Sequence, residues 1–280
     1  TATEASARSR GAATKWGGWN HTGSWEGWTG VALSNPRTMP LDYLKAVGAY
    51  AHTQRQRLHA QVSERAEDNE ACTAAHGRTP VALLAELGLI DKRFTAIGAN
   101  HVTADEAKLI GAARAIVCLC PAAERSLGLD AAPAEKLVAA GAGLALGTGN
   151  AVQIDLFEDA RLLEPALRAG RPSRAAFASE VVTPLFHAAT VAGARSLGAT
   201  GGALEVGRPA DFFTVSLLDP SLAGADPAAL LGNIVFSPGR VAVREVWVGA
   251  RQVVVNGRHA AQGAIAGKFA ALQSRLWAAP

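Results

Sequence analysis

Three polar side chains that could do chemistry lie close together in the stretch LHAQVSE: His59, Gln61 and Glu64. The stretch has the pattern of a short strand, on which His59 and Gln61 share one face. A histidine and a glutamate at a strand end are typical of metal-dependent hydrolases, in which a metal-bound water attacks carbon and a carboxylate moves protons. The alternative interpretation is a solvated Glu64 and a His59 hydrogen-bonded within the core.

Polar residues follow two further predicted strands. His101 ends the stretch GANH, beside the predicted start of a helix, and Arg125 and Ser126 lie in a predicted loop after the dipeptide CP. The guanidinium of Arg125 could hold a ligand carboxylate. We predict catalytic roles for Glu64 and His101, and a substrate-binding role for His59. In the alternative interpretation, these are ordinary core or surface residues.

Two cysteines, Cys118 and Cys120, are separated by one residue at the end of a predicted strand. This spacing is too short for a structural zinc pair. We expect the two side chains to point to opposite faces of the strand and to pack in the core. With Cys72 they make three cysteines, which give no even disulfide framework and indicate a reducing compartment such as the cytoplasm.

Strands and helices alternate about five times between residues 31 and 170, which predicts βα units and a parallel sheet. The stretch TADEAKLIGAA is a predicted helix with Thr103 as N-cap and Glu106 completing a capping box. Asp155, Glu158 and Glu164 follow at helical spacing, and we interpret them as a surface charge pattern.

After residue 200 the pattern changes to alternating apolar and polar residues, with Asn256 and Gly257 as a hairpin turn. This predicts antiparallel sheet. The sequence therefore divides into an arm at 1–30 rich in tryptophan and glycine, a βα segment at 31–200, a β-sheet segment at 201–262 and a terminal helix at 263–280.

Composition narrows the class of protein. The chain has 280 residues, of which 49% are hydrophobic, so a sizeable core can form. Only 18% of residues are charged and the net charge of +3 is scattered, which argues against nucleic acid as a partner. No apolar stretch reaches the ~18 residues of a membrane-spanning helix, and the first residues lack the apolar core of a secretory signal. We expect a cytoplasmic protein without a membrane partner.

The stretches LHAQVSE, GANHVT, CPAAERSLG, LGTGNAVQIDLFEDARLLE, LEVGRPADF and VREVWVGARQVVVNGRH occur in this order. Together they resemble the amidohydrolase superfamily, above all its branch of formimidoylglutamate deiminase and related aminohydrolases. The resemblance runs from about Gly30 to Lys268. It implies an α/β fold, a (β/α)8 TIM barrel flanked by a small β-sandwich, of which this chain would form part.

The resemblance also implies chemistry at a divalent metal, usually zinc. In the family a His-x-His pair on the first barrel strand, a histidine on the fifth and an aspartate after the eighth bind the metal. A sixth-strand histidine orients water or substrate, and a glutamate shuttles protons. The family's loop after CP contacts the polar end of the substrate, which implies substrate-binding roles for Arg125 and Ser126. The corresponding positions here hold Gln61 for the fifth-strand histidine, Gly98 for the sixth-strand histidine and Gly149 for the aspartate, whereas Glu64 keeps the place of the shuttle. We interpret these three as degenerate metal positions and expect no metal or other cofactor.

Family members have further sandwich strands and three barrel strands before the part that this chain resembles. An open partial barrel exposes strand edges. We therefore predict a homo- or hetero-oligomer, or a separately made segment, that completes the barrel. The tryptophans of the arm, Trp16, Trp19, Trp25 and Trp28, could lie at that interface or pack on their own domain.

Two functions fit these observations. The first is a non-catalytic binding, regulatory or assembly subunit, which completes or regulates a partner chain or holds a small polar ligand in the barrel mouth. The second is an active C–N hydrolase, either completed by a partner chain or using Glu64 and His101 without a metal.

Overall fold

The computed structural model describes residues 29–149, 153–168, 179–237, 239 and 242–278. The tryptophans of the arm lie outside the described residues. The chain forms two compact units, Thr1–Ala203 and Leu204–Pro280. The four-part division expected from the sequence stays a prediction.

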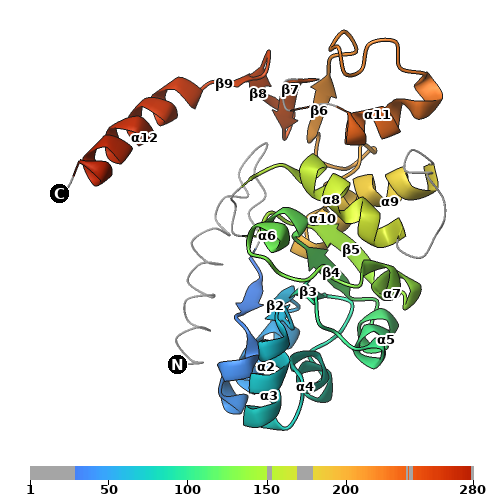
Figure 1. The fold of residues 1–280 in the computed structure, drawn as a ribbon, viewed down its shortest axis with the longest axis vertical. Coiled ribbons are helices and arrows are strands. Elements are labelled where there is room, and N and C mark those ends of the chain that lie inside the picture. Colours follow the sequence, from blue (N-terminus) through green and yellow to red (C-terminus); the bar gives the residue numbers. More distant parts are fainter. Residues whose placement is uncertain (1–28, 150–152, 169–178, 238, 240–241, 279–280) are drawn as a thin grey trace. The chain divides into compact units, whose positions relative to one another are not determined.

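The first unit contains a five-stranded parallel sheet with the strands in chain order (Figure 1). Its strands are β1 (Val31–Leu33), β2 (Leu58–Val62), β3 (Phe94–Gly98), β4 (Ile116–Leu119) and β5 (Gly143–Leu146). Each strand pairs in parallel with the next, as in the pair Gln61 and Ile97 between β2 and β3. Sequential parallel strands require crossover connections, which the helices between them provide.

The helices of this unit are η2 (Pro36–Thr38), α2 (Leu41–Thr53), α3 (Ala66–His76), α4 (Pro80–Glu86), α5 (Ala104–Ala112), α6 (Pro121–Ser126), α7 (Ala134–Ala139), α8 (Leu156–Arg168), α9 (Ser179–Ala189) and α10 (Val191–Leu197). Helices α3, α4, α5, α7 and α8 contact one another in succession. The predicted capping box of α5 is confirmed: the Thr103 hydroxyl accepts from the Glu106 N–H at 3.2 Å, and Glu106 accepts from the Thr103 N–H at 2.8 Å.

The core of the first unit lies between the sheet and these helices. Phe94, Ile116 and Leu119 of the strands and Leu84 and Ile110 of the helices are fully or almost fully buried. Burying each such side chain contributes about 1.5–3 kcal/mol.

Helix α8 is covered on more than one side, because it contacts α6, α7, α9 and β5. Glu164 is consequently only 4% exposed, and the interpretation of this residue as part of a surface pattern is wrong. The burial of Glu164 depends on how many elements pack around α8. The spacing of charged residues along the sequence does not reveal this packing.

The second unit contains a four-stranded antiparallel sheet of β6 (Phe212–Val215), β7 (Val243–Val248), β8 (Arg251–Val255) and β9 (Arg258–His259). Phe212 and Trp247 stack across β6 and β7, with ring centroids 5.7 Å apart. The predicted turn at Asn256 and Gly257 joins β8 and β9, and both residues have positive φ. The unit also has η3 (Pro227–Ala229), α11 (Leu230–Phe236) and α12 (Gln262–Trp277).

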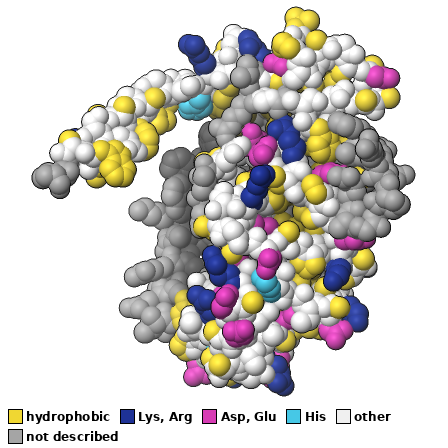
Figure 2. Space-filling view, viewed as in Figure 1, with side chains coloured by type: hydrophobic (Ala, Val, Ile, Leu, Met, Phe, Trp, Pro, Cys, Tyr) yellow, Lys and Arg dark blue, Asp and Glu magenta, His cyan; other side chains and the backbone are white. Residues whose placement is uncertain are grey.

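The predicted class is confirmed: an α/β fold with a five-stranded parallel sheet, consistent with part of a TIM barrel, and a separate antiparallel sheet. Figure 2 shows acidic and basic side chains interspersed on the visible face. Among the described residues, no helix combines the length and the apolar character needed to cross a bilayer.

Candidate active site at the strand ends

A cavity of about 320 Å³ lies at the carboxyl ends of the parallel strands. This is the end at which (β/α)8 barrels hold their active sites. All five strands contribute to it, through strand residues or the turns that follow them. Its lining consists of Leu33, Gln61, Glu64, Ile97, Gly98, Cys120, Ala123, Glu124, Leu127 and Gly149.

Gln61 and Glu64 are brought together in the cavity wall. The Gln61 side chain points from β2, and its amide Nε2 donates a hydrogen bond of 2.6 Å to Glu64 Oε2 in the turn after the strand. An amide held in this way orients the carboxylate but offers a metal only its oxygen. Zinc prefers imidazole nitrogen and thiolate to such a donor.

Glu124 is the second carboxylate of the cavity and is only 7% exposed. The backbone N–H of Cys120 donates to its Oε1 at 2.9 Å. Burial raises the pKa of the Glu124 carboxyl, and the nearby charge of Glu64 raises it further. A carboxylate kept from water beside a second carboxylate is poised to take up a proton or a cationic group.

Helix α6 presents Glu124 to the cavity and is anchored from α8. The carboxylate of Asp159 on α8 accepts a 2.9 Å hydrogen bond from the Ala122 N–H in the first turn of α6. Asp159 is fully buried, and burial raises the pKa of its carboxyl. Negative charge at a helix start stabilises that end of the helix.

Gly98 and Gly149 line the cavity in left-handed backbone conformations, with φ of +84° and +53°. A Cβ on Gly149 would come within 2.6 Å of the Ala123 side chain. Side chains are disfavoured at such positions, and at Gly149 one would also clash. The structure thus gathers Gln61, Gly98 and Gly149 around one space.

Four predicted site residues do not line this cavity. His59 bonds through Nε2 to the backbone oxygen of Ser196 on α10 at 2.9 Å, and His101 pairs with Asp130 at 3.3 Å. Arg125 and Ser126 are exposed on α6. Their functional roles stay predictions, but only Glu64 of the five proposed contact residues lies in the lining.

Glu124 and Cys120 line the cavity but are not among the site residues predicted from the sequence. The prediction of a loop after CP is wrong, because this segment forms helix α6. On a helix, residues three apart share a face. Glu124 and Leu127 therefore face the cavity together, and Arg125 and Ser126 turn away from it. An N-terminal proline at the first helical position was the available signal.

The expected placement of Cys118 and Cys120 on opposite faces is wrong. Both sulfurs lie beside Gly147, because residues two apart on a strand share a face. The two thiols share a hydrogen bond, which lowers the pKa of Cys118 and raises that of Cys120.

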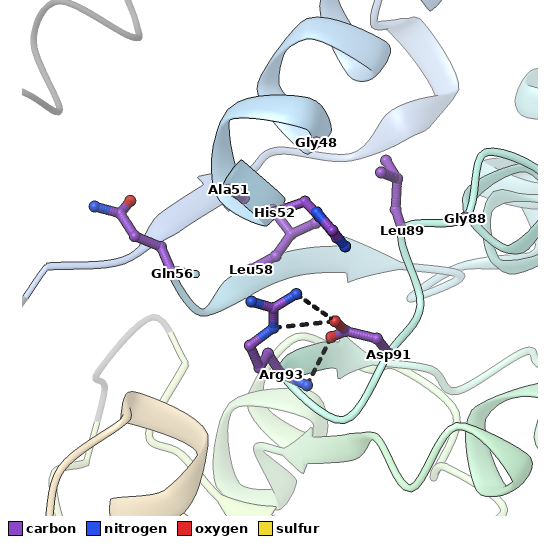
Figure 3. Close-up of a pocket in the computed structure, with 9 residues that line it drawn as sticks. All are labelled: Gly48, Ala51, His52, Gln56, Leu58, Gly88, Leu89, Asp91 and Arg93. Carbon is purple, nitrogen blue, oxygen red and sulfur yellow. Dashed lines mark hydrogen bonds and ion pairs between the residues drawn. The ribbon is translucent and has the colours of Figure 1, made fainter. Parts of the chain in front are cut away.

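A second, much smaller hollow lies among α2, β2 and the segment that leads into β3 (Figure 3). Asp91 accepts from the Arg93 guanidinium at 2.7 Å there, and His52 faces the same space. The hollow has a volume of only about 20 Å³, which is room for about one water molecule. It is therefore not a ligand site of useful size.

The family model that matches this chain is described as "Amidohydrolase family" and covers residues 20–258. The chain belongs to the amidohydrolase family. It is 32% identical over 223 residues to formimidoylglutamate deiminase from Pseudomonas aeruginosa, covering 78% of this chain and 49% of that protein. It is 28% identical to 5-methylthioadenosine/S-adenosylhomocysteine deaminase from Moorella thermoacetica, covering 85% of this chain and 56% of the relative.

The fold of this amidohydrolase is also that of a solved adenosine deaminase from Xanthomonas campestris with bound zinc. The TM-score is 0.85 at 24% identity, with 96% of this chain and 61% of the other covered. The resemblance predicted from the sequence is therefore confirmed. The chain spans about half the length of the curated relatives it matches.

The expectation that no cofactor is involved is wrong, because the zinc in this structural neighbour points to a metal cofactor. The described residues do not by themselves fit such an ion. They contain no group of three or more His, Cys, Asp or Glu side chains that could hold a metal. Catalytic zinc takes three protein ligands. A metal in this cavity would need donors beyond the described residues.

Proposed function

We propose that this amidohydrolase chain binds a small polar ligand with a cationic nitrogen group, such as an amidine, in the cavity at the strand ends. By itself the chain does not hydrolyse that ligand. The observation that carries the proposal is the lining: it contains the carboxylates Glu64 and Glu124 and, among the described residues, no basic side chain.

A cationic ligand suits these carboxylates for an electrostatic reason. Burial and the charge of Glu64 raise the pKa of Glu124, so a cation between the two would relieve both effects. The Gln61 amide donates to Oε2 of Glu64, so Oε1 of the same carboxylate can accept a hydrogen bond from an N–H of the ligand. The name of the relative from Pseudomonas aeruginosa, formimidoylglutamate deiminase, supports an amidine as the ligand group.

We propose that the chain alone does not turn over the ligand because of the residues at three positions. These are the positions at which the family has side chains associated with the metal. Gln61 offers an amide, and Gly98 and Gly149 offer no side chain at all. A hydrolase of this kind needs metal-activated water. The chain would then serve as a binding, regulatory or assembly subunit.

A second candidate is an active C–N hydrolase completed by another chain. It is supported by the half-length match to the relatives and by Glu64, which keeps the position of the proton shuttle and lines the cavity. The completing chain, a second copy or a different protein, would supply metal donors. A metal-free mechanism with Glu64 and His101 has less support, because His101 pairs with Asp130 and is outside the lining.

A cytoplasmic location remains part of the proposal. It is supported by the three cysteines, all of which are free thiols.

The test combines binding and turnover on the purified full chain. Calorimetric titration with N-formimidoyl-L-glutamate should show binding that weakens at least tenfold in Glu64→Gln and Glu124→Gln. An ammonia-release assay with the same compound and added zinc should show no turnover. Glu70→Gln on the exposed side of α3 is the matched control and should bind like the unaltered chain.

Three results would count against the proposal. Equal binding by all the variants would show that Glu64 and Glu124 do not contact the ligand. Steady ammonia release by the chain alone would favour the hydrolase, and release that appears only on mixing with a second protein would favour the completed enzyme.

A further inference from the structure

The turn that carries Glu64 is tied to the beginning of α3 on both sides of this carboxylate. On one side, the Ser63 hydroxyl donates a hydrogen bond to Asn69 Oδ1 at 2.7 Å. On the other side, the Arg65 N–H donates to Asp68 Oδ2 at 3.0 Å. Both chain neighbours of Glu64 are therefore held by side chains of α3.

Asn69 also ties this turn to the turn after β3. Its Nδ2 donates to the carbonyl oxygen of His101 at 2.9 Å. The His101 N–H in turn donates to the Ser63 carbonyl oxygen at 2.9 Å. Ser63, Asn69 and His101 thus close a ring of hydrogen bonds between the two turns. The ring lies beside the cavity, because Glu64 and Gly98 of the same segments line it.

The ring surrounds a backbone conformation that needs support. Ser63 is fully buried and has a φ of +48°, in the left-handed region that residues other than glycine rarely adopt. Ala99, in the turn after β3, has a φ of +61°. Such conformations cost free energy, persist only where surrounding contacts hold them, and concentrate at binding and active sites. The hydrogen bonds of Asn69 are contacts of this kind.

We propose that Asn69 is a positioning residue, which fixes the turn after β2 and thereby holds the Glu64 carboxylate in the cavity wall. Asn69 does not line the cavity itself. Its effect on a ligand passes through Glu64, so the inference rests on the proposed binding of a cationic ligand by Glu64 and Glu124. Side chains that contact a ligand bind it well only when neighbouring contacts hold them in the productive geometry.

A purely structural role for Asn69 is the alternative, because it gives the buried Ser63 hydroxyl a partner. The two roles differ in their consequence for Glu64. Burial raises the pKa of Glu124, and the charge of Glu64 raises it further. If the turn after β2 loosens, Glu64 leaves its position and this second contribution falls. The pKa of Glu124 thus reports the position of Glu64 independently of ligand binding.

The test uses Asn69→Ala and Ser63→Ala in the full chain. Both remove the hydrogen bond between these side chains, and Ser63→Ala does so without leaving a buried hydroxyl unpaired. Calorimetric titration with N-formimidoyl-L-glutamate should show binding about fivefold weaker in each variant, the size expected for loss of one hydrogen bond. A carbon NMR titration of the side-chain carboxyl groups should show a lower pKa for Glu124. Glu70→Gln is the matched control on α3 and should change neither measurement.

The pKa of Glu124 decides the outcome. An unchanged pKa in Ser63→Ala, with the fold retained by circular dichroism, overturns the proposal. Should Asn69→Ala fail to fold, Ser63→Ala supplies both measurements. If the unaltered chain does not bind N-formimidoyl-L-glutamate, the proposed function fails by itself, and the pKa of Glu124 still decides whether Asn69 holds Glu64 in place.

Discussion

Glu124 is a carboxylate that the fold keeps largely from water, and its neighbour Glu64 adds like charge. Both effects disfavour the ionised form, so uptake of a proton by Glu124 is linked to folding. Gly98 and Gly149 show a different constraint at the same site, since their backbone conformations are suited to glycine. The chemistry of the cavity thus depends on the carboxylates of Glu64 and Glu124. It also depends on Gly98 and Gly149, where the backbone conformation disfavours any side chain.

Glu124→Gln should flatten the pH dependence of stability. With its pKa raised in the folded state, Glu124 contributes fully to stability below its ordinary pKa, and this contribution is lost as the pH rises through the folded pKa. Glutamine keeps the acceptor for the Cys120 N–H and cannot ionise. Chemical denaturation at a series of pH values measures the effect. Parallel curves for the unaltered chain and the variant would contradict it, and Glu70→Gln controls for loss of an exposed charge.

Gly149→Ala should lower the free energy of unfolding by about 1–3 kcal/mol. Its methyl group would meet the Ala123 side chain at 2.6 Å in a left-handed backbone conformation. Gly128 also has positive φ, but a Cβ there meets nothing within 4 Å. Gly128→Ala therefore isolates the backbone effect, and denaturant unfolding compares the two. Equal losses would mean that the contact with Ala123 is relieved without cost.

At the scale of elements, strands and helices are joined by polar contacts between distant segments. Asp159 on α8 anchors the first turn of α6, and His59 on β2 contacts the last turn of α10 through the Ser196 carbonyl oxygen. Carbonyl groups in the last turn of a helix have no partner within it. His59 supplies a partner for the Ser196 carbonyl oxygen, because the ring tautomer with its hydrogen on Nε2 can donate to it.

His59→Ala should lower the free energy of unfolding by about 0.5–1.5 kcal/mol, the usual net contribution of a hydrogen bond. Binding of N-formimidoyl-L-glutamate should stay unchanged, because His59 is not in the cavity lining. Thermal or denaturant unfolding and calorimetric titration measure the two effects. The exposed His52 provides the control as His52→Ala. If His59→Ala lost ligand binding without losing stability, the result would support the predicted substrate-binding role of His59.

At the scale of the molecule, the five parallel strands form an open sheet, not a closed barrel, in the described residues. Strands β1 and β5 each pair with one neighbour only in this part of the chain. Unpaired strand edges attract further strands. The match to about half the length of the relatives agrees with a barrel that needs more strands than these five.

The purified chain should therefore associate, either with itself or with an added partner. Light scattering after size-exclusion chromatography should give a mass above the 28.8 kDa of one chain. Dilution should shift the mass downwards if copies associate reversibly. A stable particle of one chain at all concentrations, with a single cooperative unfolding transition, would count against a completing chain.

Local signals were sufficient for most of the elements. Alternation of strands and helices predicted the parallel sheet, Thr103 and Glu106 predicted the start of α5, and Asn256 with Gly257 predicted a turn. Each depends on residues within a few positions of one another. Helix α3 lacks such a local signal, because its buried residues are only Asp68 and Cys72, and Asp68 pairs with Arg37, which is distant in the chain.

The sequence by itself determined the family and the α/β class, whereas the assignment of Gln61, Gly98 and Gly149 to the family's metal positions stays a prediction. The family and the class follow from residue types in a fixed order. Only the tertiary structure decided that Glu124 faces the same cavity as Glu64, that His59 bonds to α10, and that two sulfurs meet beside Gly147. The physical reason is that these arrangements depend on contacts between segments far apart in the chain, which local periodicity does not encode.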